Sequence, residues 1–271
     1  MIKMFVTDID HTLYDSQADG IPQANRRAIA CLLERGVTVC LASSRVMPGV
    51  ASCASLLGLT GRGGYAMASN GSQVIDCRDG RRLVDRPFSL ADIHELYELA
   101  CQAGLVFTVS QGNVDVTTAY THIIDYDFDK VRMDVIVTHD LWAHIDQPVY
   151  HVLVSRGSQD MHQYIEPLTA RTGSRFNFIV SQSGVIDISL AHIDKASGLT
   201  AVMADAGVGP DEVAVIGDND NDVPMFALAG LSACVGDGNA LARQKAGHVV
   251  ASCGQGGVAS FIEGFVLGAA S

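Results

Sequence analysis

The sequence has few basic residues and no cysteine pattern typical of disulfides or zinc. Its 18 lysines and arginines stand against 30 aspartates and glutamates, which gives a formal net charge of −12. Proteins that bind nucleic acids need many basic residues to contact the phosphate backbone. This chain has an acidic excess instead, so we expect no nucleic acid partner. The seven cysteines are scattered, and none is in C-x-x-C spacing. This excludes a disulfide framework and a zinc site, and it is typical of reduced thiols in a cytoplasm.

Long apolar runs are absent as well. No segment approaches the roughly 20 apolar residues that span a bilayer. The first residues, MIKMFVTDID, carry one lysine and then turn acidic, unlike a secretory signal. With 48% apolar and 18% charged residues over 271 positions, the chain can bury a sizeable core. We therefore expect a globular cytoplasmic protein with no membrane partner, and the sequence leaves its oligomeric state open.

Strand and helix patterns alternate in the first third and again in the last third of the chain. The first third predicts strands at 2–6, 37–42 and 65–69, with helices at 21–35 and 48–57. Strands and helices joined in this order predict parallel pairing in an open α/β sheet. From Lys195 the alternation resumes, with a helix to Ala206 and strands at 213–217 and 231–235.

The middle third has a different pattern. A hairpin is expected to turn on Asp79-Gly80, and an amphipathic helix is expected between Ser89 as N-cap and Gly104. Alternating strands follow, which together predict an α+β region with mostly antiparallel pairing: 105–109, 113–118, 150–155, 175–180 and 184–190. The acidic, aromatic stretch at 123–134 is interpreted as a solvated face, with a substrate-facing loop as the alternative.

We therefore predict an α/β protein with a Rossmann-like open parallel sheet as its core and an inserted α+β cap domain. The core domain is assigned to residues 1–84 and 189–271, and the cap to residues 85–188. An α/β sheet that is interrupted and then resumed favours this interpretation over two consecutive domains.

Two acidic clusters follow predicted strands. Asp8 and Asp10 come after the strand at 2–6, and GDNDND at 217–222 follows the strand VAVIG. The carboxyl ends of parallel strands form the ligand crevice of an open α/β sheet, so we expect both clusters there. Adjacent carboxylates cost free energy unless a cation or a proton compensates them. The simplest compensating ion is Mg²⁺, which binds one or two carboxylates together with water and substrate phosphate.

Hydroxyl and cationic side chains are expected at the same edge. Ser43, Ser44 and Arg45 follow the second strand, and Lys195 stands where the α/β pattern resumes. A metal ion, a lysine and hydrogen-bond donors around a carboxylate suit phosphoryl transfer, which depends on positioning and charge stabilisation. The carboxylate itself can be the nucleophile and form an aspartyl phosphate. A second acid two residues on can protonate the leaving oxygen and later deprotonate water.

Taken in order, these motifs resemble the four motifs of the haloacid dehalogenase-like (HAD) phosphatases: DIDHT, Ser43, Lys195 and GDNDND. The resemblance extends over nearly the whole chain. It is greatest for the Cof-like branch, in which a large cap is inserted between the second and third motifs. Three further segments add to it: SNG at 69–71, VIDIS at 185–189 and GGVASFI at 256–262.

The resemblance implies a nucleophile, an acid/base and a metal site. Asp8 would be the nucleophile and a Mg²⁺ ligand. Asp10 would be the general acid/base, with its backbone carbonyl on the metal. Asp218 would complete the metal site, and Asp222 would act on the metal directly or through its ligands.

The resemblance also implies the groups that bind the substrate. Ser43 would hydrogen-bond the phosphoryl oxygens, with Ser44 and Arg45 beside it. Lys195 would neutralise charge between the nucleophile and the phosphoryl group, and Asn221 would contact the phosphate. Asp8, Asp10, Ser43 and Lys195 form the expected catalytic set.

The chain departs from the family's pattern at a few positions. The family usually has glycine at the positions of His11, Ser44, His192 and Ala196, and threonine at the position of Ser43. Serine retains the hydroxyl, so the change at Ser43 is mild. His11 puts an imidazole beside the expected acid/base, where it could tune Asp10, contact substrate or simply face solvent.

Two motifs have competing explanations. GDNDND could begin a calcium loop, but an EF-hand needs glycine at its sixth position and glutamate at its twelfth, where this chain has Val223 and Ala229. GDGNAL at 236–241 partly imitates a dinucleotide fingerprint, but Leu241 replaces the third glycine. We interpret it as a tight strand-to-helix turn without a nicotinamide cofactor.

The function that we expect is a Mg²⁺-dependent phosphatase acting on small phosphorylated metabolites such as sugar phosphates, through an aspartyl phosphate. Two alternatives remain from the sequence. A phosphomutase would return the phosphoryl group to a second hydroxyl of a sugar phosphate. A phospho-acceptor or metabolite-binding regulator would use the same acidic pocket without turnover, although Asp10 argues against a long-lived acyl phosphate.

Overall fold

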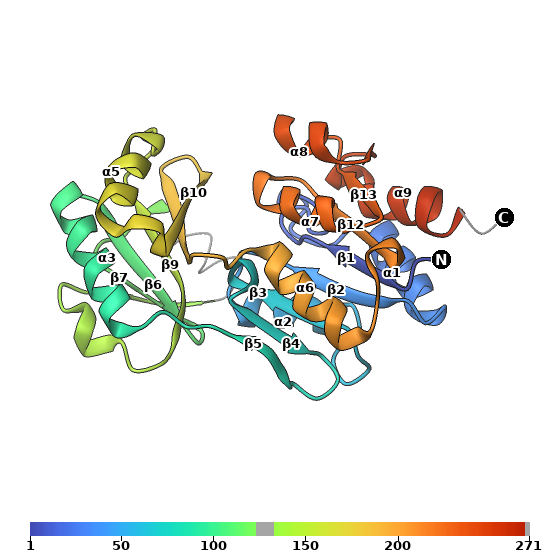
Figure 1. Cartoon of the computed structure of the whole chain (residues 1–271), viewed down its shortest axis with the longest axis horizontal. Helices are drawn as coiled ribbons and strands as arrows, with labels where there is room; N and C mark the ends of the chain where they lie inside the picture. The colour runs from blue at the N-terminus through green and yellow to red at the C-terminus, as the bar shows by residue number, and fades with distance from the viewer. Residues whose placement is uncertain (123–132, 269–271) are drawn as a thin grey trace. The chain divides into compact units, whose positions relative to one another are not determined.

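The structure, a computed structural model, describes residues 1–122 and 133–268 (Figure 1). The chain forms two compact units. The first comprises Met1–Ser44, Val50–Asp85 and Asp194–Ser271, and the second comprises Arg45–Gly49 and Arg86–Ile193. The acidic stretch interpreted above as a solvated face, 123–134, lies almost entirely outside the described residues.

The first unit contains an eight-stranded sheet with the order β14-β13-β12-β1-β2-β3-β4-β5. Its strands are β1 Met4–Thr7, β2 Thr38–Ala42, β3 Tyr65–Ala68, β4 Gln73–Asp76, β5 Arg82–Asp85, β12 Val213–Gly217, β13 Leu231–Cys234 and β14 His248–Val249. Pairing is parallel from β14 to β3 and antiparallel from β3 to β5. The predicted parallel strands and the predicted hairpin are confirmed, with small differences at the strand ends. Because β1 lies between β12 and β2, the residues that follow these three strands meet at one edge.

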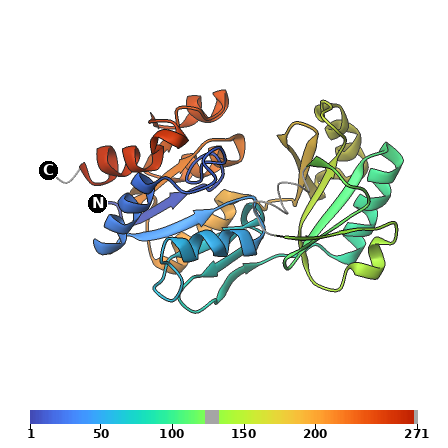
Figure 2. The same ribbon diagram turned by 180° about the vertical axis from the view of Figure 1, so that it is seen from behind.

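Helices cover both faces of this sheet, as the two opposite views in Figures 1 and 2 show. They are α1 Gln23–Glu34, α2 Met47–Leu56, α6 Lys195–Ala206, α7 Val223–Leu228, α8 Ala240–Lys245 and α9 Gly257–Phe261. On one face, Leu199 and Val202 of α6 pack with strand residues such as Val215. On the other face, Phe261 of α9 lies 6.1 Å from Phe5 of β1, measured between ring centroids. The parallel strands read as continuous apolar runs because both of their faces are buried in this way.

Helix α6 begins and ends where the sequence predicts. The Asp194 side chain accepts a hydrogen bond from the Ser197 N–H at 2.7 Å and caps the first turn. Gly207 follows the last turn with φ 64°, in the left-handed region that suits glycine. These caps fix Lys195 as the first residue of the helix, which places its side chain at the edge where β1 and β12 end.

The second unit is an antiparallel-rich sheet with helices on one face. Its strand order is β10-β11-β9-β6-β7-β8, and only the β7–β8 pair among these is parallel. The strands are β6 Val106–Gln111, β7 Val114–Thr117, β8 Asp134–Val137, β9 Val149–Ser155, β10 Phe176–Gln182 and β11 Val185–Leu190, and the helices are α3 Leu90–Ala103 and α5 His162–Thr172. The predicted α/β fold with an inserted α+β unit is confirmed.

The core of the second unit lies between the sheet and the two helices. Phe107 and Val152 of the sheet pack with Leu96 of α3 and Leu168 of α5. Residues that alternate with these along the strands project from the opposite face. Sequence patterns did not predict β8, which has four residues.

The cysteines are mostly buried thiols. Five of the seven are buried, whereas Cys31 is half-buried and Cys101 is exposed. Across residues 1–122 and 133–268, none of the helices combines the length and the apolar character that crossing a membrane requires.

Replacing the cap of α3 tests the stability of the second unit. The Ser89 hydroxyl accepts from the Asp92 N–H at 3.1 Å, and the Asp92 carboxylate accepts from the Ser89 N–H at 3.2 Å. We expect Ser89→Ala to lower the free energy of unfolding by about 1 kcal/mol, because the first turn loses its cap.

The single tryptophan makes this change measurable. Trp142 lies in the second unit and packs edge-on against Tyr97 of α3, with the ring centroids 5.7 Å apart. Its fluorescence during urea unfolding should show an earlier midpoint for Ser89→Ala. The exposed Ser260 of the first unit is the control, and an equal shift in Ser260→Ala would contradict the assignment to the cap.

Candidate active site

A buried lysine joins two carboxylates at the edge where β1 and β12 end. Asp8 directly follows β1, is 6% exposed, and donates its N–H to the carbonyl oxygen of Ile216 in β12 at 3.0 Å. Lys195 Nζ donates to Asp8 Oδ1 at 2.6 Å and to Asp222 Oδ1 at 2.7 Å. The Lys195 and Asp222 side chains are 1% and 0% exposed. The ion pairs are therefore desolvated, and each partner depends on the others to remain charged.

The second oxygen of Asp222 holds the acidic loop. Asp222 Oδ2 accepts hydrogen bonds from the backbone N–H groups of Asp218 at 2.9 Å and Asn219 at 3.1 Å. A Cβ atom on Gly217 would lie 2.3 Å from this oxygen. Residue 217 must therefore be glycine, because a side chain there would clash with the Asp222 carboxylate in the position where it accepts these two hydrogen bonds.

Asp218 completes a group of three carboxylates. The Thr12 hydroxyl donates to Asp218 Oδ1 at 2.9 Å and fixes the orientation of the carboxylate. One oxygen from each of Asp8, Asp218 and Asp222 lies within 4.8 Å of the others. Such a set of carboxylate oxygens around one point fits a hard divalent cation.

Burial and neighbouring charges shift the pKa values of the groups in the cluster. Burial raises the pKa of Asp8 well above its ordinary value, and nearby Asp222 and Asp218 raise it further against the opposing charge of Lys195. Burial, followed by the charge of Asp222, raises the pKa of Asp218 to about 6. Burial alone would lower the pKa of Lys195, but Asp222 and Asp8 raise it above its ordinary value. One ammonium group thus faces three carboxylates, and a second cation would relieve the repulsion.

The remaining predicted residues lie on neighbouring loops of the first unit, with one exception. Ser43 directly follows β2, is 1% exposed, and donates its N–H to the Met67 carbonyl oxygen at 3.0 Å. Ser44 and Asp10 are half-buried. Arg45 is buried and groups with the second unit.

Asn221 is tied to the end of another strand. Its Nδ2 donates to Oδ1 of Asn70 at 3.0 Å. The Asn70 N–H in turn donates to the Ser43 carbonyl oxygen at 3.0 Å. Asp8, Asp218, Asp222 and Lys195 therefore form one directly contacting cluster, and Ser43 and Asn221 are linked to each other through Asn70.

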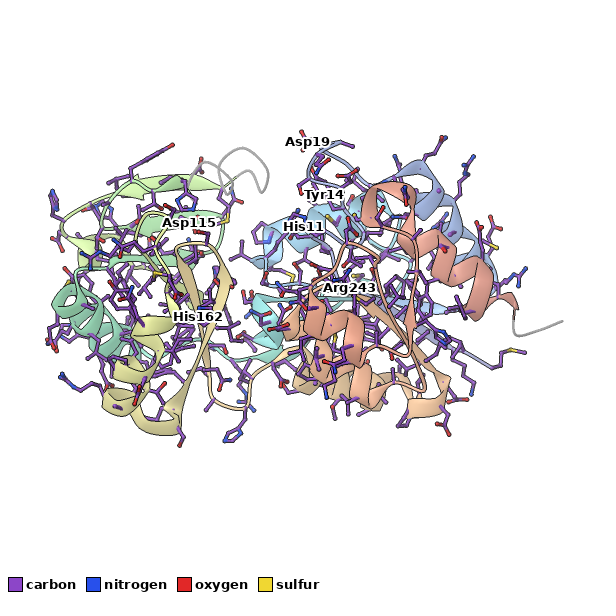
Figure 3. The ribbon with its side chains drawn as sticks, turned by 90° about the horizontal axis from the view of Figure 1, so that it is seen from above. His11, Tyr14, Asp19, Asp115, His162 and Arg243 are labelled. Carbon is purple, nitrogen blue, oxygen red and sulfur yellow. The ribbon has the colours of Figure 1, made fainter. Side chains whose placement is uncertain are left out.

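The loop after β1 contains a histidine with an unusual backbone conformation. His11 is exposed with φ 58°, and Nδ1 of its ring lies 3.3 Å from the Ser16 hydroxyl (Figure 3). His192, the other histidine at a position where the resemblance gives glycine, has φ 63°. Glycine adopts such angles without strain, whereas a residue with a side chain does not. Both histidines therefore occupy positions whose backbone conformation favours glycine.

Three residues that support the cluster were not predicted as site residues. They are Thr12, Asn70 and Asn239. Asn239 donates from Nδ2 to Asn219 Oδ1 and to Asp220 Oδ1, both at 2.6 Å, while its own Oδ1 caps α8. These residues lie in the motifs DIDHT, SNG and GDGNAL, which were noted in the sequence above. Their contacts in the folded structure are what assign them to the site.

Removing the Asp218 carboxylate should change the free energy of unfolding, because it reduces the repulsion among the three carboxylates. The folded-state pKa of Asp218, about 6, lies above its ordinary value of 3.8. The protonated side chain therefore favours the fold below pH 4, and that contribution is lost as the pH rises through 6. In a chelator at pH 7.5, we expect Asp218→Asn to be more stable than the wild type by about 1–2 kcal/mol.

Denaturant unfolding at several pH values measures this difference. The advantage of Asp218→Asn should shrink toward pH 4, and Mg²⁺ should stabilise the wild type more than the variant. A variant that is less stable than the wild type at pH 7.5 in chelator would show that the carboxylates are already compensated.

The chain is similar to known hydrolases and phosphatases. Residues 5–262 match the haloacid dehalogenase-like hydrolase family. The chain is 24% identical to the 5-amino-6-(5-phospho-D-ribitylamino)uracil phosphatase YcsE of Bacillus subtilis, over 98% of this chain and 96% of that protein. It is 25% identical to a phosphoglycolate phosphatase of Haloarcula marismortui, over 93% and 92% of the two chains.

A solved structure shows the same fold. A haloacid dehalogenase-like hydrolase from Bacteroides thetaiotaomicron superposes with a TM-score of 0.88 at 25% identity, covering 97% of this chain and 99% of that chain. The chain spans only about half the length, 53% and 45%, of two longer curated relatives. The family match covers nearly every element from β1 to α9, and this chain belongs to the haloacid dehalogenase-like hydrolases.

Proposed function

We propose that the chain is a Mg²⁺-dependent phosphatase that hydrolyses small phosphate monoesters through an aspartyl phosphate. The observation that carries this proposal is the buried contact of Lys195 with both Asp8 and Asp222 beside the third carboxylate, Asp218. The family match and the names of the relatives support a phosphatase.

Asp8 is the proposed nucleophile. Its carboxylate would attack phosphorus, form an acyl phosphate and break the bond from phosphorus to the leaving oxygen. Lys195 holds Oδ1 of Asp8 at 2.6 Å, so the carboxylate would meet the phosphoryl group in one orientation. Asp10, two residues on, would protonate the leaving alkoxide and then take a proton from the water that cleaves the acyl phosphate.

The acidic cluster is the proposed Mg²⁺ site. Asp8 and Asp218 would bind the ion, the Asp10 backbone carbonyl would join them, and Asp222 would hold the loop and Lys195 in place. When bound, Mg²⁺ supplies positive charge to the transferring phosphoryl group. The donor set fits because carboxylate oxygens are the ligands that this hard cation prefers.

The phosphoryl oxygens would be held from two sides of the cluster. The Ser43 hydroxyl and the Asn221 amide would donate to them, with Ser44 and Arg45 beside Ser43. These groups would be neutral or positive, which matters for a dianionic ligand on a chain of net charge −12.

The substrate is proposed to be a small phosphorylated metabolite, with sugar phosphates as one such class. YcsE and the Haloarcula marismortui protein are named for small phosphate monoesters, which supports this size class without identifying the compound. A cytoplasmic location fits such a substrate and the cysteine composition.

The second unit is proposed to act as the cap that selects the leaving group. Thr108, Ser110 and His151 lie on the sheet face opposite to the helices, with Asp187 beside them. The His151 ring contacts the Ser110 hydroxyl through Nδ1 and the Asp187 carboxylate through Nε2, each at 3.3 Å. A row of hydroxyl, imidazole and carboxylate groups suits hydrogen bonding to a polyol.

Phosphate release tests the chemistry. We would assay an aryl phosphate and a panel of sugar phosphates with Mg²⁺, with chelator, and with Asp8→Asn. We expect Mg²⁺-dependent release, and a loss of at least about a thousandfold in Asp8→Asn because the nucleophile is gone.

The alternatives give different results in the same assay. Isomerisation of a sugar phosphate without release would indicate a mutase, and a stable acyl phosphate without turnover would indicate a regulator. Release that persists in Asp8→Asn, with the fold verified by circular dichroism, would refute Asp8 as nucleophile.

A substitution in the second unit tests the selection of the leaving group. We expect His151→Gln to change kcat/KM for the preferred metabolite by about three- to tenfold, the usual value of a hydrogen bond, while kcat/KM for the aryl phosphate stays close to that of the wild type. His162→Gln is the matched control, because His162 begins α5 on the helical side of the sheet and is largely exposed (Figure 3). Equal effects on both substrates would contradict the proposed role.

A further inference from the structure

The turn after β3 is strained in a way that its glycine does not explain. Ser69, Asn70 and Gly71 have φ of 48°, 52° and 98° in succession. Gly71 is required by its surroundings, because a Cβ atom there would lie 2.4 Å from the Asp194 carbonyl oxygen. Nothing comparable requires a serine and an asparagine in the left-handed region, and glycine would be the less strained choice at both positions. Strained residues of this kind cluster at functional sites.

Asn70 contacts both of the residues proposed to hold the phosphoryl group. Its backbone N–H donates to the Ser43 carbonyl oxygen at 3.0 Å, so it touches the loop after β2. Its side-chain Oδ1 accepts from Asn221 Nδ2 at 3.0 Å, so it also touches the acidic loop after β12. Asn70 is 7% exposed, which keeps water from competing for these two bonds.

Asn70 makes both contacts in the left-handed conformation. With φ 52°, the N–H of Asn70 faces Ser43 while its side chain reaches Asn221. Asparagine tolerates this region better than other residues with a side chain, and it supplies an amide oxygen that glycine lacks.

The amide of Asn221 is only partly satisfied by this contact. Its Oδ1 is buried and, among the residues that the structure describes, has no hydrogen-bond partner. This oxygen is an acceptor and cannot bind a phosphoryl oxygen, but the amide nitrogen carries two N–H donors, of which Asn70 takes one. Asn70 thus fixes the amide and leaves its second N–H to donate.

We propose that Asn70 is a positioning residue for phosphate binding: it sets the separation of Ser43 and Asn221 and orients the Asn221 amide toward the phosphoryl oxygens. This inference rests on the proposed function, since it takes these two residues as the phosphoryl contacts. The strain in the turn is the cost of that positioning.

Binding of inorganic phosphate in the presence of Mg²⁺, measured by calorimetry, tests the proposal without requiring turnover. Asn70→Gly keeps the backbone conformation free of strain and removes the contact with Asn221. We expect phosphate to bind about three- to tenfold more weakly, the usual value of one hydrogen bond, with little change in the thermal unfolding midpoint. Should Asn70→Gly fail to fold, Asn70→Ser, whose shorter side chain cannot span the distance to Asn221, carries the same expectation.

A double-mutant cycle separates positioning from a direct or purely structural role. If Asn70 acts through Asn221, then Asn70→Gly should have no further effect on phosphate affinity in an Asn221→Ala background. His192→Gly is the matched control, because it relieves a similar φ of 63° at an exposed residue of the second unit. It should bind phosphate like the wild type.

The outcomes are distinct from those that test the hydrolytic function. Wild-type affinity in Asn70→Gly, multiplying effects in the double mutant, or no phosphate binding by the wild type would each overturn the proposal. Phosphate binding that depends on Asn70, together with no release from any monoester, would retain the positioning role and reject the phosphatase.

Discussion

The structure of the site depends on one buried ammonium group. Lys195 lies between Asp8 and Asp222, where three carboxylates gather within a few ångströms. A lysine can be buried there only while both ion pairs persist, and the carboxylates can ionise together only with additional positive charge. The proposed Mg²⁺ would supply this charge at the point where the oxygens of Asp8, Asp218 and Asp222 converge.

The fold brings this charge together with few special contacts. β1 and β12 are parallel neighbours, so Asp8 and Asp218 are placed at one edge by backbone pairing alone. Gly217 leaves room for the Asp222 carboxylate, and two backbone N–H groups then hold its second oxygen. The cap formed by Asp194 fixes where the first turn of α6 begins, and therefore where the Lys195 side chain starts. Sheet topology and helix capping therefore determine where the charged side chains of the site lie.

Much of this arrangement could be predicted from the sequence because it is local. Helix α6 has a cap at each end, β12 is a continuous apolar run, and GDNDND follows it directly, so their placement needs no distant contact. Thr12, Asn70 and Asn239 could not be assigned in this way, since each acts on a residue more than a hundred positions away or on a separate loop. The left-handed conformation of Ser69 and Asn70 is also hidden, because neither residue type demands it. Strand β8 was missed because its first residue, Asp134, was assigned to the acidic stretch at 123–134.

Backbone strain occurs both near the acidic cluster and away from it, so strain alone does not mark a function. Five residues other than glycine have positive φ among those described: His11, Asp19, Ser69, Asn70 and His192. His11 and Asn70 directly adjoin residues proposed for catalysis or phosphate binding, whereas His192 is an exposed residue of the second unit. What distinguishes Asn70 from the others is the combination of strain with hydrogen bonds to two separate loops of the site. A strained residue gains a functional interpretation when its unusual backbone makes contacts that the relaxed backbone could not make at the same time.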